Sequence, residues 1–127
     1  MILYLSGTQE GSRADKTIAD FANYQLPQRS RLLQDLGFLA FCVDGVELLQ
    51  PLKKPRGAEL SEEQKASNQA FSRRRVRIEH VISGVKRCRI VKDRIRLHRG
   101  GIRDLVMEVA CGLHNLRLRF RPWIPMT

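Results

Sequence analysis

The sequence has 127 residues, of which 43% are hydrophobic, so it can bury a core and differs from a disordered chain. Its 23 Lys and Arg exceed its 13 Asp and Glu, and the net charge of +10 attracts polyanions, most commonly nucleic acid. An anionic membrane surface or a ribosome would also fit this charge. No apolar run approaches the ~20 residues of a membrane span, and the apolar residues 1–6 are too few for a signal peptide. We therefore expect a cytoplasmic protein with no membrane partner.

The charge is distributed unevenly along the chain. Residues 1–50 contain four Lys and Arg against six acids, a net charge of −2, whereas residues 51–127 contain nineteen against seven, a net charge of +12. The basic excess of the second segment is where we expect a polyanion to lie. The cysteines, Cys42, Cys88 and Cys111, form no Cys-x-x-Cys pair, which indicates free thiols rather than a zinc site.

Short strand-like and helical patterns alternate in the first part of the chain. Residues 1–5 form an apolar run that predicts a buried strand at the first residue of the sequence. Helical spacing of apolar residues predicts a helix over 15–24, which Pro27 ends. Short strands are predicted at 31–34 and 46–49.

The second part of the chain is predicted to be helical. Ser61 and Gln64 form a capping-box pattern, which opens a long helix through about Ile90. A second helix is predicted over 103–118, after a flexible stretch at 99–101. The predicted apolar face of the first helix consists of Ile78, Ile82, Val85 and Arg89, with Val81 beside them. That of the second consists of Leu105, Val109, Leu113 and Leu116, flanked by Val106 and Ala110. The whole order favours a single α/β domain with a short mixed sheet flanked by helices.

Asp35 is the first candidate for chemistry. It ends a predicted strand just before Leu36-Gly37-Phe38, and carboxylates at strand ends are well placed to reach a ligand crevice. The alternative is a turn aspartate that bonds its own backbone.

Glu79 is the second candidate, a single acid in the middle of a basic helix. The basic residues around it are more numerous than the neutralisation of one glutamate requires, and a phosphate-rich ligand would explain the excess. The alternative is a surface glutamate paired with Arg75 one turn earlier. The expected DNA-binding residues are Arg73, Arg74, Arg75, Arg77, Lys86 and Arg87 of this helix and Lys53, Lys54 and Arg56 of a basic loop.

Asp35 and Glu79 are together the predicted metal ligands. Carboxylate oxygens suit Mg²⁺, which also uses phosphate oxygens of a substrate as ligands. A two-metal phosphoryl-transfer site normally needs at least three protein carboxylates, and Asp15, Asp20 and Asp44 are the remaining candidates.

Three other side chains have predicted packing roles. His80 follows Glu79 directly, and since adjacent helical residues point ~100° apart, we expect it to face away from a metal, with a phosphate contact or a metal-supporting role as the alternatives to packing. His114 is predicted to be a satisfied histidine at the edge of an apolar helix face. Trp123 is predicted to be a terminal packing anchor, with stacking on a base as the alternative.

At these positions the sequence resembles the DDE transposases of bacterial insertion sequences, in the branch related to Harbinger elements. The motifs that carry the resemblance occur in the family's order over nearly the whole chain. They are Leu3-Tyr4-Leu5-Ser6 with Gly11-Ser12 and Asp15-Lys16, Leu33-Gln34-Asp35-Leu36-Gly37-Phe38, Lys53-Lys54-Pro55-Arg56-Gly57 with Glu59-Leu60 and Gln64-Lys65, Arg75-Val76-Arg77-Ile78-Glu79-His80-Val81-Ile82, and Gly112-Leu113-His114-Asn115-Leu116-Arg117.

The resemblance implies an RNase H-like fold and DNA transposition, in which Mg²⁺ or Mn²⁺ assists strand cleavage and the freed 3′-hydroxyl attacks target DNA. Within it, Asp35 matches the second catalytic acid and Glu79 the third. The family's first acid lies on a strand that would precede Met1. We therefore expect residues 1–127 to be the C-terminal part of a catalytic domain, a partial RNase H-like fold with its first strand missing. Such a chain would lack cleavage activity alone, and the full-length enzyme would be compatible with a homo-oligomer.

Two positions depart from the family's pattern. Ala14 stands where the family usually has His before the Asp-Lys pair, and Leu39-Ala40 stands where it has Gln-Gly. These departures suggest a split or decayed copy. The alternative function is that of a non-enzymatic, basic nucleic-acid-binding protein, in which Glu79 would have no essential role.

Overall fold

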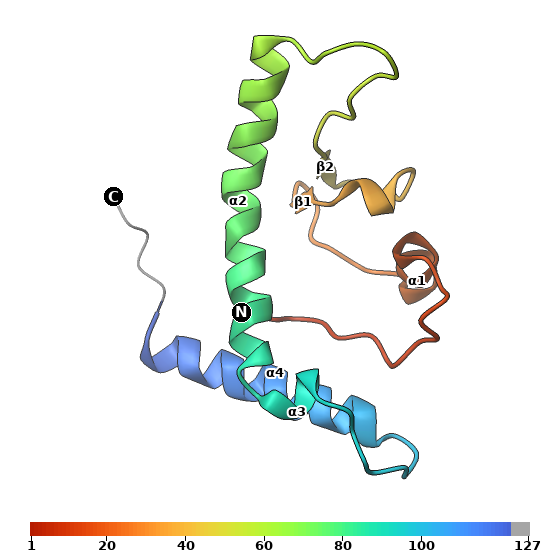
Figure 1. The fold of residues 1–127 in the computed structure, drawn as a ribbon, viewed down its shortest axis with the longest axis vertical. Coiled ribbons are helices and arrows are strands. Elements are labelled where there is room, and N and C mark those ends of the chain that lie inside the picture. Colours follow the sequence, from red (N-terminus) through yellow and green to blue (C-terminus); the bar gives the residue numbers. More distant parts are fainter. Residues whose placement is uncertain (123–127) are drawn as a thin grey trace. The chain divides into compact units, whose positions relative to one another are not determined.

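The computed structural model describes residues 1–122, so Trp123 and its predicted role lie outside the described residues. The chain divides into two compact units. We name Gln9–Val76 the sheet unit, and Met1–Thr8 together with the chain from Arg77 onward the helical unit. Helix α2 (Glu62–Lys86) continues from the first unit into the second (Figure 1). The prediction of a single domain stays a prediction.

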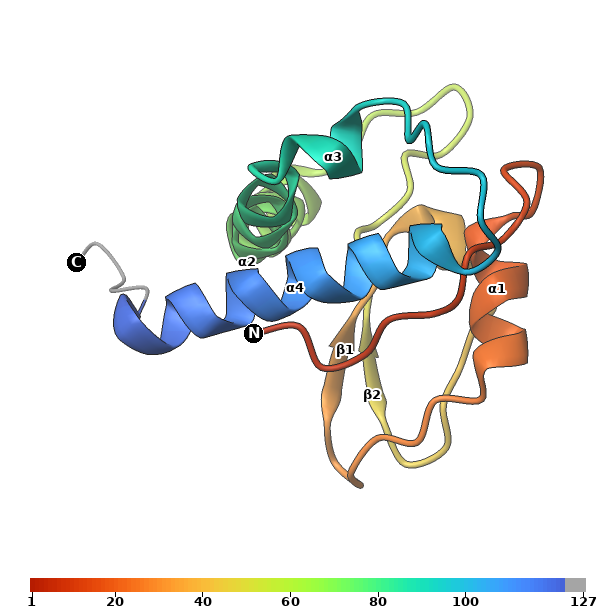
Figure 2. The ribbon, with the colours of Figure 1, turned by 90° about the horizontal axis from the view of Figure 1, so that it is seen from below.

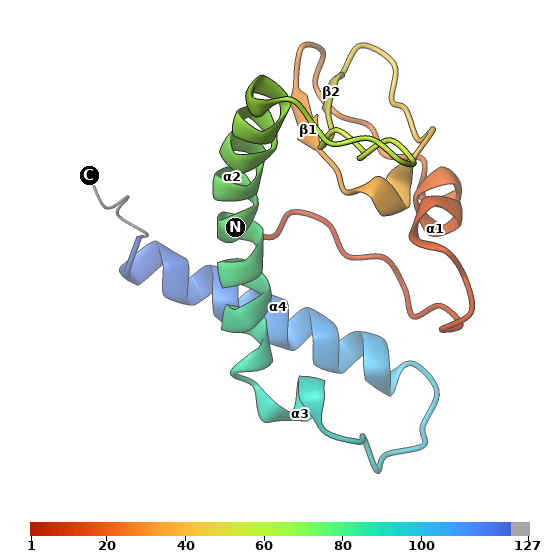
Figure 3. The ribbon, with the colours of Figure 1, turned by 45° about the horizontal axis from the view of Figure 1, so that its top comes forward.

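The sheet unit combines one helix with a small parallel sheet. Helix α1 (Asp15–Ala22) is followed by strand β1 (Arg31–Leu33), the short 3-10 helix η1 (Leu36–Phe38) and strand β2 (Glu47–Leu49). The two strands are parallel, with Leu32 opposite Leu48, and Figure 3 shows them side by side. Helices mixed with this sheet confirm the α/β class, but the sheet of the described chain is parallel, not mixed as predicted.

The core of the sheet unit is small. Ala19 of α1 and Phe41 are its buried hydrophobic residues, at 2% and 6% exposure. Tyr24 and Phe38 each meet the Phe41 ring edge to face, with ring centroids 6.1 and 6.5 Å apart. The buried Gln34 amide donates to the carbonyl of Phe41 at 3.2 Å, which links the end of β1 to this aromatic cluster.

The predicted helix over 15–24 is confirmed, but it ends earlier. Asn23 takes a left-handed conformation with φ of 46°, which ends α1 at Ala22 before Pro27 is reached. Asparagine tolerates this conformation better than most residues, because its short side chain bonds locally. The two predicted strands are also confirmed and are each one residue shorter, at three residues.

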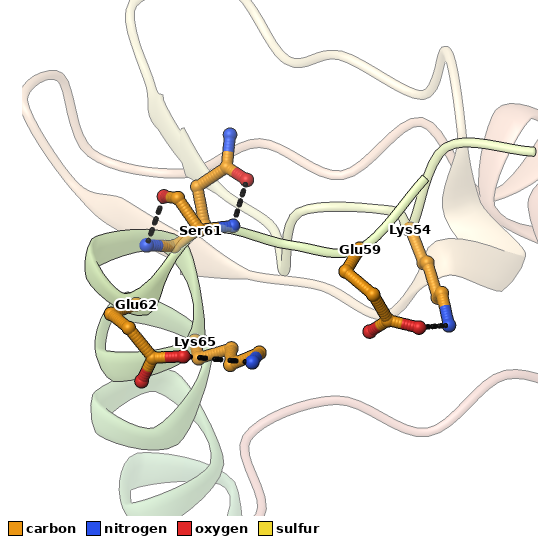
Figure 4. Close-up of polar contacts among 6 residues, drawn as sticks. Lys54, Glu59, Ser61, Glu62 and Lys65 are labelled. Atoms are coloured by element: carbon orange, nitrogen blue, oxygen red, sulfur yellow. Dashed lines mark hydrogen bonds and ion pairs between the residues drawn. The ribbon is translucent and has the colours of Figure 1, made fainter. Parts of the chain in front are cut away.

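The capping box at the start of α2 is confirmed, as Figure 4 shows. The Ser61 hydroxyl accepts from the backbone N–H of Gln64 at 3.2 Å, and the Gln64 side chain accepts from the N–H of Ser61 at 3.0 Å. The helix ends at Lys86 rather than near Ile90. A separate short helix, α3 (Arg89–Lys92), begins after Cys88.

The helical unit is built on the contact between the end of α2 and α4 (Ile102–Phe120). Val85 of α2 packs with Ala110 and Cys111 of α4, and Ile2, Cys88 and Val91 cover this cluster. Figure 2 shows the N-terminal segment running along α4. None of the helices described within residues 1–122 has the length and apolar character that crossing a membrane requires.

The predicted strand at residues 1–5 is wrong. Residues 1–5 form no strand, and Leu3 and Tyr4 are 84% and 54% exposed. The segment is bound by side chains of α4 and, within residues 1–122, does not pair with a neighbouring strand. Asn115 accepts from the N–H of Ile2 at 2.7 Å and donates to its carbonyl at 2.8 Å, and Asp104 accepts from the N–H of Thr8 at 2.7 Å.

The predicted apolar faces of both long helices are largely wrong. Only Val85 of the α2 face is buried, whereas Ile78 and Ile82 are about half exposed. In α4 the buried residues are Ala110, Cys111 and His114. The predicted apolar face of α4, Leu105, Val109, Leu113 and Leu116, is about half exposed, and of the two residues predicted to flank it Ala110 is buried. Small residues allow helix backbones to approach closely, so the contact forms on the side of α4 that carries Ala110 and Cys111.

Candidate active site and nucleic-acid interface

Asp35 lies two residues after the end of β1, near the strand end where it was predicted, and caps η1. One carboxylate oxygen accepts from the backbone N–H of Leu36 at 2.7 Å, so the turn-aspartate alternative is correct for this oxygen. The other oxygen lies 3.4 Å from a guanidinium nitrogen of Arg75 in α2. Since the Asp35 side chain is 52% exposed, this ion pair contributes at most about 1 kcal/mol. The carboxylate therefore remains available to a stronger cation.

Glu79 lies in the helical unit, on the exposed surface of α2. Within residues 1–122 its carboxylate has no hydrogen bond and no ion pair, so the alternative of a pair with Arg75 is not observed. It lines a pocket of about 510 Å³, and the other charged residues of that lining are Lys86, Arg87 and Lys92. The unpaired carboxylate of Glu79 thus shares its pocket with three cationic side chains.

The described residues fit a divalent cation in the type of ligand but not in number. Asp35 and Glu79 offer carboxylate oxygens, the donors that Mg²⁺ prefers. They belong to different compact units, and the part of the chain that is described contains no cluster of three His, Cys, Asp or Glu that would hold a metal. Asp20, a candidate third acid, is paired with Lys16 at 2.5 Å.

The basic loop before α2 is exposed and partly neutralised. Lys54 forms an ion pair with Glu59 at 2.5 Å (Figure 4), whereas Lys53 and Arg56 form no ion pair within the described chain. Arg73 and Arg74 of α2 are likewise exposed, and neither has a salt bridge within residues 1–122. Lys53, Arg56, Arg73 and Arg74 are therefore free to meet a polyanion. Lys54 and Arg75 are instead paired with Glu59 and Asp35.

A second pocket, of about 590 Å³, lies between α2 and α4. We name it the arginine pocket, because Arg77, Arg87, Arg117 and Arg121 line it. Arg117 and Arg121 were not predicted as binding residues. Arg117 follows His114 by three residues, which places both on one face of α4, and Arg121 caps the end of this helix. His80 lines this pocket and not that of Glu79, and since it is exposed, the packing role predicted for it is wrong.

His114 is buried in this pocket, at 8% exposure, against Gly84 of α2. A Cβ atom at Gly84 would lie 2.4 Å from Nδ1 of His114, so only glycine admits the ring at this separation. The ring is buried as predicted but is not satisfied, since neither nitrogen has a hydrogen-bond partner. Burial lowers the pKa of His114 below its ordinary 6.5, and the N-terminal amine, Arg117 and Arg87 lower it further.

Comparison with known protein families gives a match over most of the chain. Residues 1–115 match a family model described as DDE superfamily endonuclease. This match covers most of the chain, including both candidate acids and His114. No curated protein and no solved structure matches the sequence.

Proposed function

The chain belongs to the DDE superfamily endonucleases, and from this premise we propose that it supplies two acids and a DNA-binding surface to a transposase of the insertion-sequence, Harbinger-related type. The family implies DNA as substrate and generally uses divalent metals. The finer proposal is that the fold is RNase H-like and that the reaction is DNA cleavage followed by strand transfer.

The unpaired carboxylate of Glu79 is the observation that carries this proposal. A surface glutamate surrounded by arginines and lysines normally forms an ion pair, and Glu79 forms none with a described residue. The cations in its pocket, Lys86, Arg87 and Lys92, suit phosphate groups, and the carboxylate suits a metal ion bound to those phosphates.

Asp35 and Glu79 are the proposed metal ligands of this chain, with Mg²⁺ or Mn²⁺ as the ion. A divalent cation would supply positive charge to the phosphate under attack and lower the pKa of a bound water. Asp35 would give up its contact with Arg75 to bind the ion, and Arg75 would then be free to contact the DNA backbone. Lys53, Lys54 and Arg56 would hold the same backbone without reading its sequence.

Cation-dependent DNA binding tests the proposal. The affinity for a labelled DNA duplex is measured by fluorescence anisotropy in EDTA and in Mg²⁺ at constant ionic strength. Glu79→Gln should bind several-fold more tightly than the wild type in EDTA, because it removes a negative charge beside the phosphates. Mg²⁺ should tighten binding by the wild type and leave Glu79→Gln unchanged.

Glu108→Gln is the matched control, because Glu108 lies on α4 of the same unit and lines neither the Glu79 pocket nor the arginine pocket. It makes the same change in net charge and should respond to Mg²⁺ like the wild type. If Mg²⁺ has the same effect on all three proteins, no cation binds at Glu79. The non-enzymatic nucleic-acid-binding alternative would then be preferred.

A further inference from the structure

The ionisable side chains of the described chain that line the arginine pocket are all basic. Among residues 1–122, four guanidinium groups and two imidazoles line it, and no Asp or Glu does. Arg87, Arg117 and Arg121 form no salt bridge with any residue of the described chain. Like charges held together repel one another, and a bound anion would remove that repulsion.

Helix geometry brings these groups to one place. Arg117 lies in the last turn of α4, and Arg121 is the residue that caps this helix, its N–H donating to the carbonyl of Arg117 at 2.9 Å, so the two residues lie close together. On α2, Arg77 precedes Gly84 by seven residues, two turns along the same face. The close contact between Gly84 and His114 joins these two faces. The arginines therefore converge from two helices within the helical unit.

His114 provides a second, independent indication of a ligand. Its ring is more than nine-tenths buried, lines the pocket and has no partner for either nitrogen. A buried polar group without a partner costs about 1–3 kcal/mol. A neutral imidazole has one N–H to donate, which an oxyanion in the pocket would accept.

We propose that the arginine pocket holds a backbone phosphate of DNA, contacted by Arg117, Arg121 and Arg87, with His114 as a further donor. Guanidinium groups match phosphate oxygens in charge and in paired hydrogen-bond geometry. A carboxylate ligand would suit the same groups less well, because it offers fewer oxygens to donors that converge from two helices. The identification of the phosphate as part of DNA rests on the proposed function, whereas the anion site itself does not.

The first experiment compares two double variants with the same net charge. Arg117→Gln with Arg121→Gln removes two pocket arginines, and Arg103→Gln with Arg119→Gln removes two from α4 that do not line it. DNA affinity is measured in EDTA across a salt series. The pocket variant should lose at least tenfold in affinity, and the slope of log K against log salt should fall by about 2. The control should lose much less.

The second experiment follows the His114 ring by NMR in the unsubstituted protein. Inorganic phosphate and then a short DNA duplex are added, and the His114 ring signals should shift with both. The shifts should disappear in the pocket variant and persist in the control. This readout does not depend on Asp35 or Glu79.

The outcomes separate the two proposals. Equal DNA affinity in the two double variants would overturn the pocket assignment and leave the function proposed for Glu79 standing. A His114 response to phosphate without any DNA binding by the wild type would overturn the assignment to DNA and the proposed function together. Loss of affinity in the pocket variant alone, with the His114 shift, supports the phosphate site.

Discussion

Ala40 has a backbone φ of 65°, in the left-handed region that favours glycine. For a residue with a Cβ atom this conformation costs roughly 1–2 kcal/mol. The position is also one at which the resembled transposases usually have glycine, after the Asp-Leu-Gly-Phe motif. The conformation of the turn after η1 thus suits the family's residue better than the alanine found in this chain.

Ala40→Gly should therefore stabilise the sheet unit. The relief of strain exceeds the added flexibility of the unfolded chain, so we expect a gain of up to about 1 kcal/mol in the free energy of unfolding. Chemical denaturation followed by circular dichroism measures it. Ala58→Gly, in an exposed loop without a positive φ, should be slightly destabilising. A loss of stability in both variants would contradict the interpretation of Ala40.

The positions of single residues were predicted correctly where the signal lies in their neighbours in the sequence. The position of Asp35 near a strand end follows from apolar residues before it and a turn after it, and the structure places it there. The packing of His114 against Gly84 could not be predicted, because the two residues are 30 positions apart in sequence and meet only through tertiary structure. Arg117 and Arg121 were missed although their spacing from His114 was visible.

At the scale of elements, the start of α2 follows from local chemistry. Ser61 and Gln64 satisfy each other's backbone N–H groups, and this is a signal contained within four residues. The end of α2 has no such signal, and the helix stops at Lys86, earlier than predicted. The strand predicted at residues 1–5 and the buried face of α4 failed for another reason, because apolar character alone does not identify the partner that covers it.

Ser61→Ala should weaken the first turn of α2. The variant loses the acceptor for the Gln64 N–H, and a lost N-cap costs about 1 kcal/mol. Amide hydrogen exchange at Gln64 should become roughly fivefold faster, since that energy corresponds to such a change in the opening equilibrium. Ser67→Ala, within the helix and away from its start, is the control and should leave exchange at Gln64 unchanged. Equal exchange rates in both variants would argue against the capping box.

At the scale of the whole molecule, charge and motif order predicted more than packing did. The family was recognisable from five motifs, and the family match over residues 1–115 confirms the superfamily. The assignment of Asp35 and Glu79 as catalytic acids stays a prediction. Residues that lie in separate compact units cannot be placed together by local sequence patterns, which is why the geometry of a shared site does not follow from the sequence.

The 127-residue chain by itself should show no DNA cleavage. Asp35 and Glu79 provide two carboxylates, fewer than a two-metal site normally uses, so the ions would be bound too weakly for turnover. Conversion of supercoiled plasmid to the nicked form, in Mg²⁺ and in Mn²⁺, measures this. Nicking that disappears in Asp35→Asn and in Glu79→Gln would contradict the prediction of inactivity and identify the acids directly. Nicking that persists in both variants would indicate a contaminant.

The two contacts that hold the N-terminal segment to α4 have a consequence for cooperativity. Asn115 and Asp104 are eleven residues apart, about 16 Å along the helix, and the six steps of the chain from Ile2 to Thr8 span at most about 20 Å. With so little slack, each contact keeps the other's partner at a high effective concentration. The two contacts are therefore cooperative. Either contact alone would bind the segment to α4 weakly, and together they bind it far more tightly than two independent hydrogen-bonded contacts would.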